Sequence, residues 1–276
     1  MRLASVLLLL LALTAGCQGG PRAHLVLATT TSVGNSGLLD ALAPAWQQAT
    51  GVELRPTLAG SGRALRMLAG GQADVVVSHA PAAEAATLRA HPAWHYRKIM
   101  FNDFVLVGPA DDPAGISQER TLEGALHRIV ASGATFVSRG DQSGTHEREG
   151  ALWALTGAAP SADALLTSGA GMAVTLRQAA DREAYTLSDR ATFEQLAPQL
   201  TLRVLFAGDP RLVNTYSVVV DTQGPRHRDA LRFAEWLENG AGRGLIARYR
   251  IAGSAVQPFI VWPEGARRDA PDALPR

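Results

Sequence analysis

The sequence has little of several features that would point to a particular class of protein. It contains one cysteine, Cys17, so no internal disulfide can form, and a chain of 276 residues does not need one to hold its core. The 26 basic and 25 acidic residues leave a net charge of +1 without any basic stripe, so general nucleic-acid binding is not expected. With 47% hydrophobic residues, the composition excludes a disordered or fibrous chain.

The apolar run near the beginning of the chain is too short to span a membrane. It follows the positive start Met1-Arg2 and extends from Leu3 to Leu13, about eleven residues where a spanning helix needs about 20. Three small residues then lead to Cys17, an arrangement that resembles the processing site of bacterial lipoproteins. We therefore expect residues 1–17 to be a signal peptide with a lipobox, Cys17 to be lipidated, and residues 18–23 to form a tether. Plain cleavage and release is the alternative.

From His24 onward, short apolar strands alternate with helical stretches, which predicts an α/β architecture built on mostly parallel sheets. In the first series, strands are expected at 25–28, 52–58 and 73–78, and helices at 38–50 and 63–69. In the second series, strands are expected at 135–138, 184–187 and 202–206, and helices at 145–155, 172–180 and 191–197. Two further helices, at 226–238 and 242–249, close the chain.

Two apolar runs, 104–108 and 216–220, are expected to cross between the two series. Prolines and acidic residues follow the first of them, a shift in composition that is typical of a passage between lobes. We therefore expect two α/β lobes joined by two crossing strands, with the ligand cleft between them. The first lobe would comprise residues 24–106 plus 218–262, and the second residues 107–217. The tail, 263–276, is rich in proline, alanine and charge, and we expect it to be disordered.

Four hydroxyl residues in a row, Thr29-Thr30-Thr31-Ser32, follow the first strand and precede a helix. At a strand-to-helix turn, hydroxyls and free backbone N–H groups face one point, where the helix N-terminus favours negative charge. A helix cap alone needs only one such residue, so the run indicates ligand binding. The segment Gly60-Ser61-Gly62 repeats the construction ahead of the next helix, although on its own it is a weaker signal.

A third turn of this kind lies between a strand and a helix of the second series. Arg139 offers a planar fork of donors to an oxyanion, while Ser143, Gly144 and Thr145 offer neutral donors from another side. Asp141 has two interpretations. It holds Arg139 in one rotamer by a salt bridge, or it accepts a hydrogen bond from a protonated ligand such as hydrogen phosphate.

Together, the three turns predict a site for a small multiply charged anion, held by hydrogen bonds between the lobes without a metal or cofactor. His79 and His146 are interpreted as packing or supporting residues, because no second histidine or cysteine stands at metal-ligand spacing. No catalytic residue is expected, because the Gly-x-Ser-x-Gly motif is absent. An enzyme that acts on an anionic substrate is kept as the alternative from another class.

Several segments, taken in order, resemble the tungstate-binding lipoproteins of bacterial ABC importers. The resemblance extends from about residue 25 to residue 262, and its motifs are specific as an ordered set. The segments that carry it are Thr29–Ser32 with Ser36–Leu39, Gly60–Leu65, Ala73–Pro81, Asn102–Pro109 and Arg139–His146.

The resemblance implies a type II periplasmic-binding-protein fold whose cleft closes on tungstate, or on molybdate. It also implies delivery to a membrane permease driven by a cytoplasmic ATPase, a location in the periplasm or on the outer face of the cytoplasmic membrane, and a monomer. The implied ligand contacts are Thr30, Thr31, Ser32, Ser61, Arg139, Ser143, Gly144 and Thr145, with Asp141 and His146 supporting them. The spacing from Arg139 to Thr145 is also similar to phosphate-binding proteins, so phosphate or another tetrahedral oxyanion is the alternative ligand.

Overall fold

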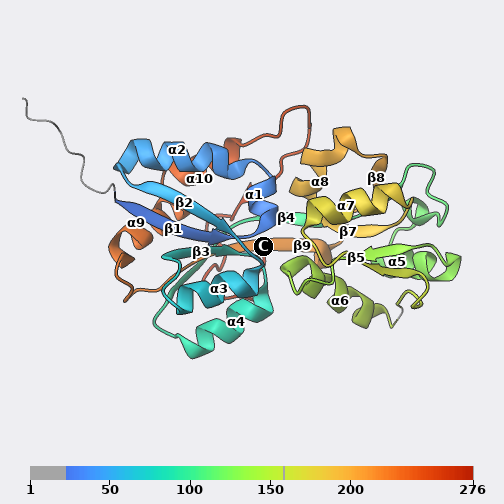
Figure 1. The fold of residues 1–276 in the computed structure, drawn as a ribbon, viewed down its shortest axis with the longest axis horizontal. Helices are drawn as coiled ribbons and strands as arrows, with labels where there is room; N and C mark the ends of the chain where they lie inside the picture. The colour runs from blue at the N-terminus through green and yellow to red at the C-terminus, as the bar shows by residue number, and fades with distance from the viewer. Residues whose placement is uncertain (1–22, 158, 276) are drawn as a thin grey trace, which may run out of the picture.

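The structure, a computed structural model, describes residues 23–157 and 159–275. It consists of two α/β lobes joined by long strands (Figure 1). The expected signal peptide and the lipidation of Cys17 lie outside the described residues. Within 23–157 and 159–275, no helix has the length and apolar character that crossing a membrane requires.

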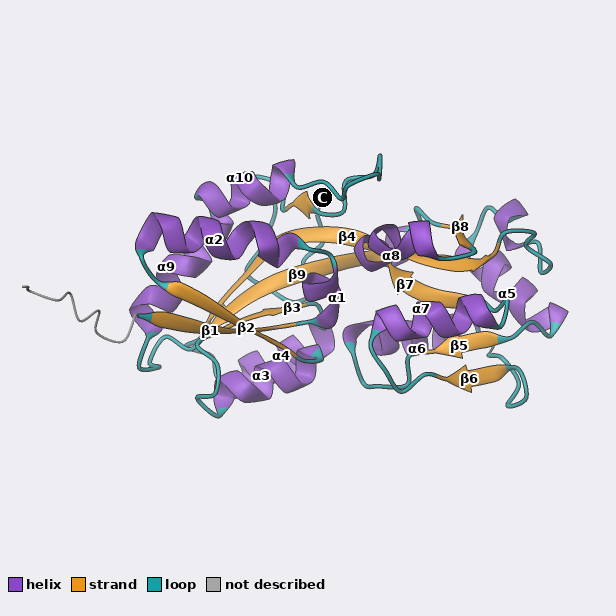
Figure 2. Ribbon diagram, turned by 45° about the horizontal axis from the view of Figure 1, so that its top comes forward, coloured by secondary structure: helices purple, strands orange, loops and turns teal. Residues whose placement is uncertain are grey.

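The first lobe is a sheet with helices on both faces (Figure 2), in the strand order β10-β4-β9-β3-β1-β2. Its strands are β1 (His24–Thr29), β2 (Glu53–Leu58), β3 (Val75–Ser78), β4 (His95–Pro109), β9 (Val213–Val220) and β10 (Ile260–Val261). β1 is parallel to β2 and β3, whereas β9 is antiparallel to β3 and β4. Its helices are α1 (Thr31–Asn35), α2 (Leu38–Thr50), α3 (Ser61–Ala69), α4 (Pro81–Ala90), α9 (His227–Glu238) and α10 (Ala241–Arg248).

In the second lobe, β4 pairs with β7 (Thr186–Asp189) and β8 (Leu202–Phe206). β5 (Phe136–Ser138) adjoins β7 through a bridge from Phe136 to Tyr185, and it is parallel to β6 (Leu165–Thr167). The helices are α5 (Leu122–Ser132), α6 (Gly144–Thr156), α7 (Met172–Asp181) and α8 (Arg190–Leu196), with short 3-10 turns at Ile116–Gln118, Ala197–Gln199 and Pro210–Leu212.

The two lobes meet where β4 changes partners. Residues up to Asp103 pair with β9, and residues from Phe104 onward pair with β7. Residue Val213, the first of β9, already pairs with β4 in the first-lobe sheet. The strands therefore cross a few residues before the expected boundaries at 106/107 and 217/218.

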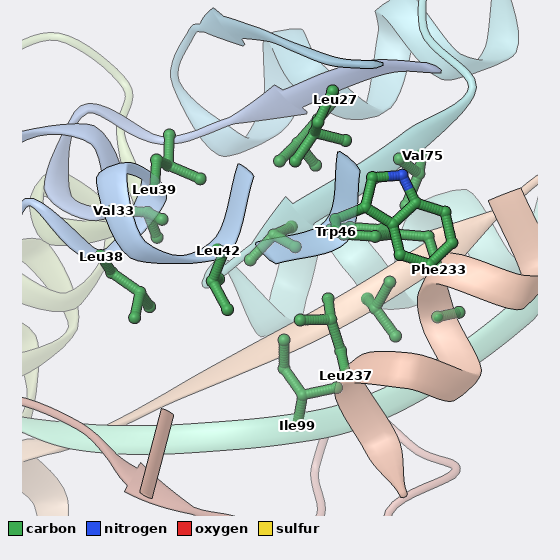
Figure 3. Packing of buried hydrophobic residues seen from close by; sticks show 14 of the residues in the cluster. Leu27, Val33, Leu38, Leu39, Leu42, Trp46, Val75, Ile99, Phe233 and Leu237 are labelled. Carbon is green, nitrogen blue, oxygen red and sulfur yellow. The ribbon is translucent and has the colours of Figure 1, made fainter. Parts of the chain in front are cut away.

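The core of the first lobe forms where α2 packs on the sheet and on α9 (Figure 3). Leu38, Leu42 and Trp46 recur at helical spacing and are buried, as the periodicity of the sequence predicts. The rings of Trp46 and Phe233 pack in a T-shaped arrangement, with 5.1 Å between ring centroids. Pro44 lies inside α2 on its exposed side, away from this contact.

The expectation of a disordered tail is wrong for residues 263–275. Ala270 is buried, and the backbone N–H of Lys98 in β4 donates to the carbonyl of Arg268 at 2.8 Å. The tail thus satisfies a backbone group of β4 that would otherwise need a partner. Its composition alone did not reveal this pairing.

The topology gathers the strand-to-helix turns at the boundary between the lobes. β1, β2 and β3 lead into α1, α3 and α4, while β5 and β6 lead into α6 and α7. Because parallel strands end at the same edge of a sheet, the turns of each lobe lie together and face the other lobe (Figure 1).

Candidate functional site

Helix N-termini from the two lobes meet in the cleft. A Cβ added to Gly60, the N-cap of α3, would lie 3.9 Å from the Cα of Ser143, the N-cap of α6. A Cβ added to Gly171, the N-cap of α7, would lie 3.8 Å from Thr31 Oγ1 in α1. The lobes are therefore closed, and the positive ends of α3, α6 and α7 border the space between them.

The threonine run lies at the boundary between the lobes, on the side of the first lobe. Thr30 is the N-cap of α1, is 2% exposed, and accepts a hydrogen bond from the backbone N–H of Val33 at 3.4 Å. A hydroxyl that accepts in this way keeps its own hydrogen for donation. Thr31 is half-buried opposite Gly171, whereas Ser32 is buried within α1.

Ser61 lies at the same boundary, next to Gly60 of the first lobe. It is the first residue of α3, is fully buried, and its Oγ accepts a hydrogen bond from the backbone N–H of His79 at 3.2 Å. That bond leaves the hydroxyl hydrogen of Ser61 for a ligand. Because His79 lies directly after β3, the carboxyl ends of two neighbouring strand-helix units are tied together here.

Arg139 is the cation of the site, and it is held rigidly. It is 2% exposed, its Nε donates to the carbonyl of Ala170 at 2.9 Å, and its Nη2 donates to Asp141 Oδ2 at 2.5 Å. The second oxygen of Asp141 accepts from the backbone N–H of Ser143 at 3.2 Å. Both oxygens of Asp141 thus have a partner within the protein.

Thr145 is the most informative residue of the site. It is fully buried in the first turn of α6, and its Oγ1 has no hydrogen-bond partner among the described residues. A buried hydroxyl without a partner is costly, and an oxyanion bound at this boundary would supply the acceptor that Thr145 lacks. Gly144 beside it has a packing reason, because a Cβ there would lie 2.7 Å from the His79 carbonyl oxygen.

Ser143 and His146 support the turn that precedes α6. The Oγ of Ser143 accepts from the backbone N–H of His146 at 3.3 Å, which caps the helix. His146 Nδ1 in turn accepts from the backbone N–H of Gln142 at 3.0 Å, and Gln142 has a φ of 57°. His146 thus stabilises a left-handed residue in the turn that precedes α6.

His79 is a packing residue whose ring has a fixed proton position. Asn102 donates to the carbonyl of Pro258 at 3.3 Å, so its Oδ1 accepts from Asn214 at 2.9 Å. Asn214 Oδ1 must then accept from His79 Nδ1, which lies 3.0 Å away. Burial lowers the pKa of His79, which keeps the ring neutral between the lobes.

One residue that the sequence analysis missed belongs with this group. Ser168 follows β6, and its Oγ is buried without a hydrogen-bond partner in the described part of the chain. The backbone N–H of the next residue, Gly169, donates to the carbonyl of Arg139 at 3.0 Å, so Ser168 lies close to the guanidinium-bearing turn. Ser168-Gly169-Ala170-Gly171 ahead of α7 is the same strand-turn-helix signal that identified the other three turns.

The structure therefore brings Thr30, Thr31, Ser61, Arg139, Ser143, Gly144 and Thr145 to one boundary between the lobes, and Ser32 is buried beside Thr31 in the first turn of α1. Among the described residues, no cluster of three or more His, Cys, Asp or Glu side chains could hold a metal ion. Neutral donors around a single buried guanidinium suit a small oxyanion.

Comparison with known proteins agrees with this geometry. A family model described as a PBP superfamily domain matches residues 15–239. The tungstate-binding protein TupA of Peptoclostridium acidaminophilum is 36% identical to this chain over 264 residues, which cover 90% of this chain and 92% of that protein.

Solved structures lead to the same family. The tungstate ABC transporter structure from Geobacter sulfurreducens has a TM-score of 0.75 and 35% identity, covering 82% of this chain and 98% of that one. The tungstate-binding protein TupA from Desulfovibrio alaskensis G20 has a TM-score of 0.73 and 38% identity, covering 87% and 98%. The expected fold is confirmed, as is the expectation of a binding protein instead of an enzyme. The chain belongs to the TupA family of binding proteins within the PBP superfamily.

Proposed function

We propose that this chain is the extracytoplasmic binding protein of an ABC importer and that it binds tungstate or molybdate between its lobes. The relatives named above are described as tungstate-binding proteins and as part of a tungstate ABC transporter. The proposed ligand contacts are Thr30, Thr31, Ser32, Ser61, Arg139, Ser143, Gly144 and Thr145.

The observation that carries the proposal is the buried, unpartnered hydroxyl of Thr145, in the same interlobe boundary as the buried guanidinium of Arg139. Each hydrogen bond to a charged ligand contributes roughly 1.5–3 kcal/mol. A tetrahedral oxyanion with four oxygens can use several such donors at once, so tight binding needs no metal.

The contacts of Asp141 bear on the choice between tungstate and phosphate. Hydrogen phosphate carries an O–H that needs an acceptor in the site, whereas tungstate and molybdate can be bound by donors alone. Asp141 is the acidic residue of the ligand-binding turn, and its two oxygens are taken by Arg139 and by the backbone N–H of Ser143. Each carboxylate oxygen still has a free acceptor site, so Asp141 could also accept a phosphate O–H, and the calorimetric comparison of the anions decides between the two cases.

Binding proceeds by closure of the lobes. The first-lobe turns at Thr30 and Ser61 capture the anion while the cleft is open. The turn that bears Arg139 and Thr145 then moves onto it and completes the shell of donors. In the closed structure Ser61, Arg139 and Thr145 are each at most 2% exposed, so the anion cannot leave unless the lobes part.

The cellular setting belongs to the same proposal. Lipidation of Cys17 would hold the protein at the outer face of the cytoplasmic membrane, in the periplasm, where a permease and its cytoplasmic ATPase receive the anion. We propose a monomer. Labelling of the expressed full-length chain with a radioactive fatty acid, compared with Cys17→Ser, tests the anchor.

Titration calorimetry tests the ligand. The chain that begins at Gln18 is titrated with tungstate, molybdate, phosphate and sulfate under identical buffer conditions. Tungstate or molybdate binding far more tightly than phosphate is the expected result. Tight binding of phosphate alone would favour the phosphate alternative and make Asp141 a ligand contact. No binding signal with any of the four anions would overturn the proposal.

A further inference from the structure

Two hydrogen bonds between the closed lobes, outside the anion site, have a glutamate of the second lobe as the acceptor. In one, the backbone N–H of Ala82 in α4 donates to Glu147 Oε1 of α6 at 3.3 Å. In the other, Ser254 Oγ donates to Glu194 Oε2 of α8 at 2.8 Å. α6 with α4, and α8 with the segment that follows α10, lie at opposite edges of the molecule (Figure 1).

The Glu147 contact completes a helix end of the other lobe. Ala82 lies in the first turn of α4, where backbone N–H groups have no partner within the helix. Glu84 of α4 accepts a hydrogen bond from the backbone N–H of Ala80 at 3.1 Å. Glu147, on the other lobe, accepts one from the backbone N–H of Ala82. A carboxylate at a helix N-terminus is also favoured by the helix dipole. When the lobes part, Ala82 loses this partner.

The Glu194 contact lies next to the place where β4 passes from one lobe to the other. Arg190, one turn earlier on α8, donates from Nε and Nη2 to the two oxygens of Asp103, each at 2.6 Å. Asp103 is the residue at which β4 changes partners between the lobes. Arg190 also lies 3.8 Å from Glu194, whose side chain is only 15% exposed. Glu194 is therefore held in place while its other oxygen accepts from Ser254.

We propose that Glu147 and Glu194 are positioning residues that latch the closed state from opposite edges of the cleft and so raise the affinity for the anion without touching it. The inference rests on the proposed function, because it concerns the closure of the same site. Glu147 follows Thr145 by two residues on α6, so the two side chains project about 200° apart around the helix. Thr145 would bind the anion, while Glu147 holds α6 against α4 of the first lobe.

Matched variants test the latch. Glu147→Ala and Glu194→Ala remove the acceptors, whereas Glu147→Gln and Glu194→Gln keep an acceptor oxygen at each place. Tungstate affinity is measured by calorimetry, the radius of gyration by X-ray scattering with and without tungstate, and the unfolding midpoint by calorimetric scanning. Each alanine variant is expected to bind about 3- to 10-fold more weakly, as for the loss of one hydrogen bond. The double alanine variant should multiply the two effects, because the sites are far apart.

The scattering result separates the latch from a structural role. Without tungstate, the alanine variants should have a larger radius of gyration than the wild type, and saturating tungstate should restore the compact form. The glutamine variants should bind within about twofold of the wild type, and the unfolding midpoints should not change. A double alanine variant with wild-type affinity and wild-type scattering would overturn the inference, as would glutamine variants as weak as the alanine ones. If the wild type does not bind tungstate, the proposed function fails, while the anion-free scattering still decides the latch.

Discussion

The buried hydroxyl of Thr145 allows a direct test of ligand binding at a single side chain. Its hydroxyl is buried without a partner, so Thr145→Val should remove a ligand contact and no protein contact. We expect the affinity for tungstate to fall by roughly 10- to 100-fold, corresponding to about 1.5–3 kcal/mol, while the unfolding midpoint stays the same or rises. Calorimetric titration and scanning measure the two quantities. Thr145→Ser keeps the hydroxyl and should bind nearly as the wild type does, and equal affinity of the valine variant would remove Thr145 from the site.

Arg139 differs from Thr145 because it also has partners within the protein. Arg139→Ala removes the fork of donors and leaves Asp141 unpaired beside the anion. We expect a loss of roughly 3 kcal/mol or more in binding free energy, with the circular dichroism of the native fold preserved. Arg139→Lys keeps the positive charge but not the planar fork of donors. Its affinity for tungstate should therefore lie between that of the wild type and that of Arg139→Ala. Titration calorimetry of the three proteins checks the order, and unchanged binding by the alanine variant would contradict it.

At the scale of elements, a buried charge network joins β3, α4, β4 and β9. Lys98, the only lysine of the chain, donates to Thr215 Oγ1 at 2.7 Å and lies 3.5 Å from Glu84 Oε2. Glu84 also accepts from Tyr96 at 2.6 Å, and both Lys98 and Glu84 are fully buried. Burial raises the pKa of Glu84, but the charge of Lys98 and the hydroxyl bonds outweigh burial and lower it overall.

Removal of Lys98 should therefore destabilise the first lobe. Lys98→Met leaves a buried, unpaired carboxylate, and we expect the free energy of unfolding to fall by about 3–5 kcal/mol in urea titrations. Lys98→Met combined with Glu84→Gln removes both charges and should recover most of the loss. If the double variant is as unstable as the single one, the ion pair is not the cause.

The same network predicts how stability depends on pH. Because folding lowers the pKa of Glu84, its contribution is present above the ordinary value of 4.5 and is lost as the pH falls through the lower folded value. The free energy of unfolding should thus decrease as the pH falls below about 4.5. Urea titrations from pH 3 to pH 7 measure this slope, which should be shallower in the double variant Lys98→Met/Glu84→Gln.

The sequence predicts helices and strands whose hydrophobic pattern is local. It does not predict those whose buried polar groups are paired with residues far away in the chain. The spacing of Leu38, Leu42 and Trp46 predicts α2, and three hydroxyl or glycine turns predict the cleft. β4 was predicted only over 104–108, although it begins at His95. Its first half contains Lys98, whose charge and N–H are satisfied by Glu84 and by the tail, and neither partner is visible in the local sequence.

At the scale of the whole molecule, affinity depends on the closure of the lobes as well as on the contacts with the anion. Ser61 and Arg139 lie on different lobes and are both at most 2% exposed, so the complete shell exists only in the closed form. The contacts with the anion and the contacts between the lobes must therefore together cover the cost of bringing the lobes together. A change that prevents close approach should weaken binding even if it removes no hydrogen-bond donor to the ligand.

Gly144 provides that change, with a matched control on the same helix. A Cβ at Gly144 would lie 2.7 Å from the carbonyl oxygen of His79 on the other lobe, whereas a Cβ at Gly150 would meet nothing within 4 Å. Both residues lie in α6, where alanine is a better helix former than glycine, so neither substitution should lower the unfolding midpoint. We expect Gly144→Ala to weaken tungstate binding by at least tenfold and to keep a larger radius of gyration with tungstate present. Gly150→Ala should bind and scatter as the wild type does. If calorimetry and X-ray scattering find the two variants alike, close packing of α6 against His79 is not what completes the site.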